Sequence, residues 1–87
     1  MQWTSHHMVE GAPKFIVFYK PGCPSCNKMH QSWIDLADQV AHNNLNLNVM
    51  ALNREDNLNA IRHFRVMSYP SIRLYKGTND KEYVEFP

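Results

Sequence analysis

The stretch Lys14–Met29, KFIVFYKPGCPSCNKM, contains both cysteines of the chain and joins an apolar segment to a predicted helix. Residues 15–19 are uncharged and β-branched or aromatic, which is typical of a strand covered on both faces. This pattern stops at the Pro-Gly pair of residues 21–22, where glycine permits a sharp change of direction. Pro24 has the fixed φ angle that suits the first turn of a helix. The sequence therefore predicts that Cys23 lies at a helix start.

That position has a chemical consequence for Cys23. The free N–H groups of a first helical turn and the positive end of the helix dipole favour a thiolate, the reactive form of cysteine. The next residue is a proline without an N–H, so the expected donors to the sulfur are Ser25 and Cys26, with added positive potential from Lys20 and Lys28. Cys26 is one turn deeper on the same helix face, close enough for a disulfide with Cys23. We predict that Cys23 is the attacking sulfur and Cys26 the resolving sulfur.

Composition and charge limit the classes of protein. A chain of 87 residues with 44% hydrophobic side chains and a net charge of +1 predicts one globular domain without a nucleic-acid or polybasic membrane surface. One C-x-x-C pair is too few cysteines for a disulfide-stapled secreted miniature. Residues 1–13 lack the pattern of a secretion signal, and no stretch is apolar for the roughly 20 residues of a membrane span. We therefore expect a cytosolic location and no membrane association.

The remaining elements follow from hydrophobic periodicity. Residues 1–13 are predicted to form an arm or a short helix, in which Trp3, Met8 and Val9 share a face. Spacings of three and four predict a helix of several turns after the cysteines, with the apolar stripe Cys26, Met29, Trp33, Leu36, Ala37 and Val40. Alternation predicts a strand over residues 45–52, and strand, helix, strand is the right-handed crossover that makes two strands parallel.

The C-terminal third predicts a short helix and a hairpin. Residues 53–56 offer a turn and capping residues for a helix whose inner face holds Leu58, Ile61 and either Phe64 or Arg65. Residues 71–75 and 82–86 read as strands joined by a turn cluster, and thus as an antiparallel hairpin. The predicted fold class is therefore α/β, with a mixed sheet.

The motifs YKPGCPSC and VMSYPSIRLYKG, with this order of elements, resemble the thioredoxin superfamily over about residues 14–86. The resemblance implies a thioredoxin-like domain over residues 14–87 and a cis proline, Pro70, beside Cys23. It also implies that Tyr69 offers main-chain groups to an extended peptide substrate, and that Gly22, Pro24 and Pro70 complete the substrate-binding surface. The implied reaction is thiol-disulfide exchange with other proteins, which needs no cofactor or metal.

The chain departs from the family pattern in several places. Val17 occupies the position where the family often has a buried acidic residue, which can take the proton of the second cysteine. His30 is a candidate substitute base, although an exposed helix histidine is the preferred interpretation. Gly22 replaces the usual aromatic residue. The paired-glycine motif of glutaredoxins is absent, so a protein disulfide is preferred over glutathione as the partner.

The family's first strand and final helix are not evident, and without that helix one sheet face would be uncovered. A truncated chain or a minimal variant covered by the N-terminal arm is preferred over an oligomer, so a monomer is expected. Two rival functions remain open. One is a redox-inactive or weakly active binding module that uses the Tyr69-Pro70 groove. The other is a metal site including both cysteines, which lacks a second ligand pair at matching spacing.

Overall fold

The computed structural model describes residues 8–77 and 79–86. Along the chain lie β1 (Lys14–Tyr19), α1 (Pro24–His42), β2 (Asn48–Asn53), α2 (Leu58–His63), β3 (Ser71–Tyr75) and β4 (Val84–Phe86). The strands form one sheet in the order β2-β1-β3-β4, in which β1 is parallel to β2 and antiparallel to β3, and β3 is antiparallel to β4. The predicted α/β fold with a mixed sheet is confirmed.

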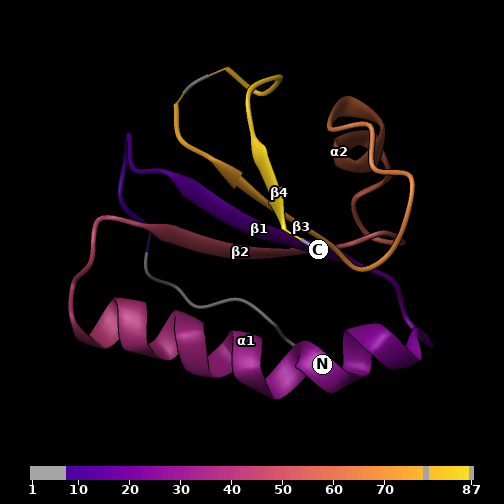
Figure 1. Ribbon diagram of the computed structural model, residues 1–87, viewed down its shortest axis with the longest axis horizontal. Coiled ribbons are helices and arrows are strands. Elements are labelled where there is room, and N and C mark those ends of the chain that lie inside the picture. Colours follow the sequence, from indigo (N-terminus) through magenta and orange to yellow (C-terminus); the bar gives the residue numbers. More distant parts are fainter. Residues whose placement is uncertain (1–7, 78, 87) are drawn as a thin grey trace.

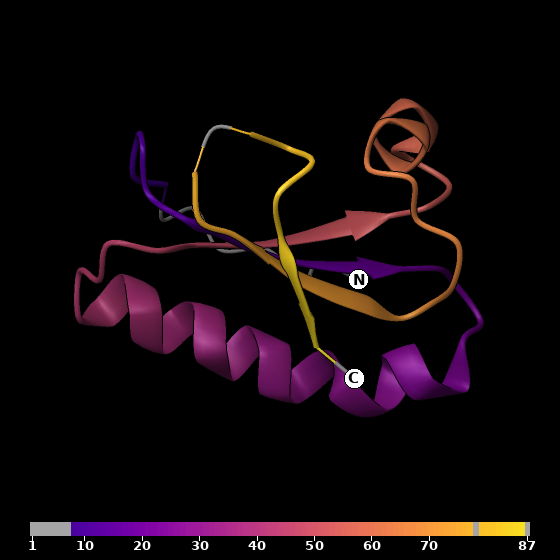
Figure 2. The same ribbon diagram turned by 45° about the horizontal axis from the view of Figure 1, so that its top comes forward.

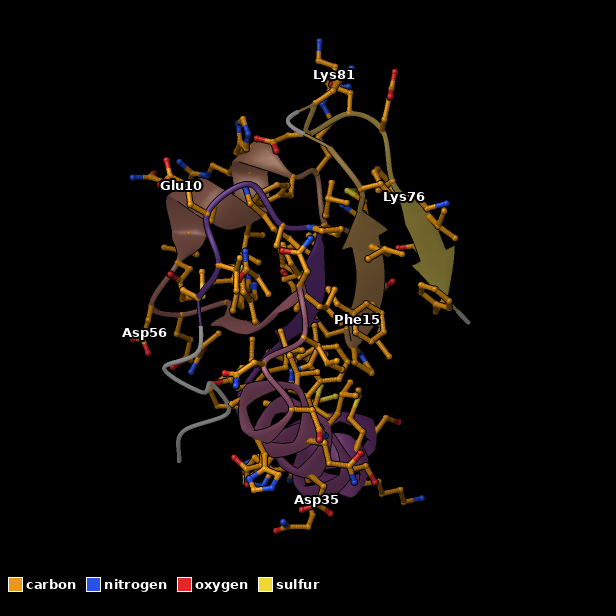
Figure 3. The ribbon with its side chains drawn as sticks, turned by 90° about the vertical axis from the view of Figure 1, so that its left-hand side faces the viewer. Glu10, Phe15, Asp35, Asp56, Lys76 and Lys81 are labelled. Carbon is orange, nitrogen blue, oxygen red and sulfur yellow. The ribbon has the colours of Figure 1, made fainter. Side chains whose placement is uncertain are left out.

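The two helices lie on opposite faces of this sheet (Figures 1 and 2). Successive side chains of a strand point to opposite faces, so β1 contributes to two separate cores. Val17 packs on the α1 face, and Ile16 and Phe18 pack on the α2 face. On the α1 face, the rings of Phe15 and Trp33 are 4.9 Å apart. Figure 3 shows Phe15 on the side of the sheet that faces α1.

The long helix agrees with its predicted apolar stripe. Trp33, Ala37 and Val40 are buried against β1 and β2, as is Cys26. The helix ends at His42 with Asn43 as its C-cap, and the following Asn44 has a φ of 50°, a conformation that asparagine tolerates better than most residues. Polar side chains such as Asp35 project from the other face, away from the sheet (Figure 3).

The second strand begins later than predicted. Alternating leucines indicated a start at residue 45, but β2 begins at Asn48, and Leu45 is about half exposed. The start of β2 is set by its pairing with β1. Lys14 opposite Asn48 is the first pair of the β1–β2 ladder, and Pro13 before it contributes only its carbonyl, which accepts the Asn48 N–H at 2.8 Å.

The N-terminal segment is held by the side chain of Asn48. Its Oδ1 accepts the Val9 N–H at 2.6 Å, and its Nδ2 donates to the Val9 carbonyl at 2.7 Å. Residues 8–13 contain a turn, with Gly11 at a φ of 78°, in place of the predicted helix alternative. Trp3 and the rest of residues 1–7 lie outside the described residues.

The short helix and the last strand also differ from prediction. Ile61 is buried and Phe64 packs on Phe18, as predicted, but Leu58 is 49% exposed. α2 has only six residues, which is less than two helical turns. Ile61 is the residue of this helix that is buried against the sheet. β4 begins at Val84 instead of residue 82, and the ring of Tyr83 packs 5.2 Å from that of Tyr75.

Arg73 on β3 is buried, a feature that the sequence did not indicate. Its guanidinium group donates to the carbonyls of Phe64 and Arg65 just after α2, and it pairs with Glu85 on β4 at 3.1 Å. It also lies 4.3 Å from the centre of the Tyr83 ring. These bonds satisfy the charge and fasten the end of α2 to the β3–β4 hairpin.

The edge of the sheet at β4 is incompletely covered by the described residues. Val84 and Phe86 are 45% and 41% exposed, opposite Leu74 and Ile72 of β3. The Phe86 ring contacts Phe15 edge-on at 5.5 Å. This edge of the sheet therefore carries apolar side chains that the described residues only partly cover. Among the described helices, none has the length and apolar character needed to cross a membrane.

We predict that Asn48→Ala lowers the free energy of unfolding by about 1–3 kcal/mol, because the Val9 N–H loses its acceptor and the Val9 carbonyl keeps only the Ala12 N–H as a donor. Urea unfolding followed by tryptophan fluorescence measures this change. Asn46→Ala, an exposed neighbour, is the matched control and is expected to change stability by less than about 0.5 kcal/mol. Equal stability of the two variants would show that Asn48 does not anchor the N-terminal segment.

Candidate active site

Cys23 is the N-cap residue of α1. Its backbone is extended, with φ −88° and ψ 111°, and Pro24 occupies the first helical position. Gly22 turns the chain from β1 toward the helix at a φ of 75°, which a residue with a side chain rarely adopts. The Cys23 Sγ accepts the Cys26 N–H at 3.3 Å. The predicted helix start, and this donor, are confirmed.

The loop before β3 meets Cys23 from 46 residues away in the chain. The Tyr69–Pro70 peptide bond is cis, and the Cys23 Sγ donates to the Tyr69 carbonyl at 3.9 Å. Lys20 extends over the Tyr69 ring, with 5.9 Å from Nζ to the ring centre. Figures 1 and 2 show the end of β1, the start of β3 and the start of α1 together at one end of the molecule. The sequence-predicted residues around Cys23 are thus neighbours in space.

The surroundings of Cys23 lower the pKa of its thiol. The largest cause is a hydrogen bond from the Cys26 side chain, and smaller contributions come from the N–H groups of Cys26 and Ser25 and from the charge of Lys20. Partial desolvation acts in the opposite direction. Lys28, which was expected to contribute, is not among these causes. The thiolate of Cys23 is therefore favoured by backbone and side-chain donors.

Cys26 has the opposite environment. Burial raises the pKa of its thiol, and the hydrogen bond to Cys23 raises it further, while the Lys20 N–H lowers it. The side chain has no exposed surface and lies in the same core as Val17. Val17 thus contributes an apolar side chain to the core that contains both cysteines. The two thiols differ in the direction of their pKa shifts, and both are buried, with 6% of Cys23 and none of Cys26 exposed.

Other candidate groups lie outside this arrangement. His30 is half-buried on α1 and is not among the causes of either cysteine pKa shift. Within the described part of the chain, no three His, Cys, Asp or Glu residues are close enough to hold a metal ion together. The chemistry that the geometry supports is therefore that of the two sulfurs.

A groove of about 350 Å³ lies next to Tyr69, between the cis-proline loop and α2. Its walls include Arg54, Leu58, Arg62 and Met67. Sequence reasoning missed these residues as a site. They come from the loop after β2, from α2 and from the loop before β3, and no motif links them. A hollow of about 770 Å³ lies between the end of α2 and the β3–β4 turn, and it includes neither cysteine.

The fold and the paired thiols define a thioredoxin-fold protein with a C-x-x-C site. The chain matches the Thioredoxin family over residues 3–86, and it belongs to this family. A "Thioredoxin domain-containing protein" of Theileria parva is 33% identical over 61 residues, which are 70% of this chain and 26% of that protein.

Solved structures agree with this membership. The J-Trx1 fragment of ERdj5 superimposes with a TM-score of 0.72 and 28% identity, over 88% of this chain and 35% of that one. The first thioredoxin domain of mouse protein disulfide-isomerase A4 gives a TM-score of 0.69 at 19% identity, over 90% of this chain and 54% of that one, and supports the fold alone. The chain therefore spans about a quarter of the Theileria parva relative and about a third of the ERdj5 fragment.

We predict that the rate at which iodoacetamide alkylates Cys23 rises with pH at a lower midpoint in the native protein than in the urea-unfolded protein. The reason is that the native environment lowers the pKa of this thiol. Cys26 is expected to react slowly, since it is buried and its pKa is raised. Peptide mass spectrometry after timed quenching assigns the two rates. In Cys26→Ala the Cys23 midpoint should move up, since the largest cause of the lowered pKa is removed.

Asn27→Ala, an exposed change on the same helical turn, is the control for this experiment. It should keep the low midpoint of Cys23. An identical midpoint in native and unfolded protein would contradict the lowered pKa of Cys23.

Proposed function

We propose that this domain is a thiol-disulfide oxidoreductase that acts on disulfides of other proteins through Cys23 and Cys26. The observation that carries the proposal is the position of the Cys23 sulfur. It accepts the Cys26 N–H at the helix start and faces the carbonyl of Tyr69. A stabilised thiolate beside main-chain groups that can bind an extended peptide is the combination that disulfide exchange with a polypeptide needs.

The reductive direction proceeds in two exchanges. The Cys23 thiolate attacks one sulfur of the substrate disulfide, the substrate S–S bond breaks, and the other substrate sulfur leaves as a thiolate. Cys26 then loses its proton and attacks the Cys23 sulfur, which forms the Cys23–Cys26 disulfide and releases the second substrate thiolate. Two electrons pass from the pair to the substrate, and the substrate thiolates take up two protons. Oxidation of a substrate is the reverse sequence.

The second exchange is the step that this chain assists least. Cys26 is buried with a raised pKa, and Val17 supplies no carboxylate to take its proton. The Lys20 N–H donates to its sulfur and lowers the pKa, so this donor stabilises the thiolate once it forms. Conversion of the Cys23 thiolate to a mixed disulfide also removes the sulfur charge that opposes ionisation of Cys26. We infer that resolution becomes easier after the substrate has bound covalently.

The same burial supports a second candidate function. A module that uses the surface around Tyr69 and Pro70 to hold a partner, with little or no turnover, needs neither an ionised Cys26 nor a carboxylate at position 17. Turnover of a disulfide substrate separates the two proposals. Protein substrates and a recycling reductase or oxidase are the proposed partners of the enzyme, and a cytosolic location is proposed with it.

For the enzyme, we predict that Cys23→Ser abolishes reduction of a synthetic peptide with one intramolecular disulfide, because the attacking sulfur is lost. Cys26→Ser should still attack but not resolve, so a disulfide between Cys23 and the peptide should accumulate. Mass spectrometry of acid-quenched samples measures it, and dithiothreitol should release the peptide. Full turnover by Cys23→Ser would overturn the assignment of roles.

We further predict a reversible two-electron transition of the Cys23/Cys26 pair when the protein is equilibrated in glutathione buffers of defined ratio. Trapping of free thiols measures the fraction reduced. The midpoint gives the reduction potential of the pair. A low potential favours reduction of substrates, and a high potential favours their oxidation or isomerisation. If both thiols remain reduced in every buffer, the binding module replaces the enzyme as the proposed function.

A further inference from the structure

The groove beside Tyr69 shares this residue with the proposed site of exchange. Tyr69 forms part of its wall, and the carbonyl of the same residue faces the Cys23 sulfur at 3.9 Å. A residue of extended chain spans about 3.3 Å. Because Tyr69 borders both places, a side chain close in sequence to a substrate cysteine at Cys23 is the one that can reach this groove.

The groove has an apolar wall and a cationic rim. Met67 is 90% exposed and Leu58 is 49% exposed, while Ile61 and Val66 behind them are buried. Arg54 and Arg62 supply the two charges. Such a surface fits a side chain with an aliphatic stem and an anionic end, which describes glutamate.

The two guanidinium groups are available to an incoming carboxylate. Across residues 8–77 and 79–86, the described ion pairs join His63 to Asp80 and Arg73 to Glu85, and neither Arg54 nor Arg62 takes part in one. The nearest acidic residues in sequence, Glu55 and Asp56, line a different hollow at the start of α2. Figure 3 shows Asp56 projecting outward beside α2.

We propose that Arg54 and Arg62 are specificity-determining residues that select disulfides flanked by an acidic residue, which binds in this groove. The inference rests on the proposed function, because it concerns the substrate of the same exchange. The reacting sulfurs stay those described above, and the arginines act by holding the adjacent substrate side chain. The preferred partner is thus a protein whose accessible disulfide lies in an acidic segment.

The test uses peptides that each contain one intramolecular disulfide. In one series the residue before both cysteines is Glu, Gln, Leu or Lys, and in a second series the residue after them is varied in the same way. Reduced protein is mixed with excess peptide, and the second-order rate constant is measured from acid-quenched samples. In at least one series we expect the rate constant of the Glu peptide to exceed that of the Gln peptide by about two- to tenfold. This is the range for two exposed ion pairs that act together.

Two double variants examine the cause of this preference. In Arg54→Gln/Arg62→Gln the Glu to Gln rate ratio should fall to about one, and in Arg54→Glu/Arg62→Glu the Lys peptide should become preferred over the Glu peptide. A merely structural role of the arginines would not reverse the preference. Lys76→Gln/Lys81→Gln removes the same charge from the β3–β4 turn (Figure 3) and should keep the wild-type ratio.

The outcomes separate this inference from the proposed function. If the reduced protein reduces none of the peptides, the oxidoreductase proposal fails. If it reduces all of them but without preference, or prefers Leu to Glu, the groove does not select acidic residues and only the inference falls. A preference for Glu that survives in Arg54→Gln/Arg62→Gln, or that disappears in Lys76→Gln/Lys81→Gln, would likewise overturn it.

Discussion

The pairing of β1 on both of its edges is the constraint on which the rest of the structure depends. β1 is hydrogen-bonded to β2 on one side and to β3 on the other, and its side chains enter both cores. A strand buried in this way has one register that keeps its apolar groups covered. The position of its last residue, Tyr19, is therefore fixed, and the following turn places Cys23 at the end of the sheet.

The same pairing brings together the two halves of the site. β1 and β3 are antiparallel, so the end of β1 lies beside the start of β3, where Tyr69 and Pro70 precede the first paired residues. The Cys23 sulfur then meets both a helix N-terminus and a main-chain carbonyl. Sheet topology alone thus gives the two thiols different surroundings. Cys23 lies at the turn, whereas Cys26 is carried one helical turn into the core, where burial raises the pKa of its thiol.

The features that were predicted most reliably from the sequence are those that local backbone preferences control. The uncharged strand, the Pro-Gly turn and the helix from Pro24 follow from local preferences, and all are present. The misses have non-local causes. The start of β2 depends on its pairing with β1, and the burial of Arg73 depends on two carbonyls and a carboxylate that come from other elements. The exposure of Leu58 follows from the shortness of α2, which periodicity does not reveal.

In the site, the reactivity of Cys23 depends on residues that are close in sequence, whereas the proposed substrate selectivity depends on residues that the fold brings together. The reactivity of Cys23 comes largely from groups inside the sequence from Lys20 to Cys26, so a short motif suffices to predict it. The groove draws its walls from three segments that the fold brings together, and its exposed side chains can change without disturbing either core. A family that keeps the first set of residues can therefore retain one reaction while the second set adapts to different substrates. For this chain, the two arginines and the exposed methionine of that second set are the physical basis for expecting an acidic partner.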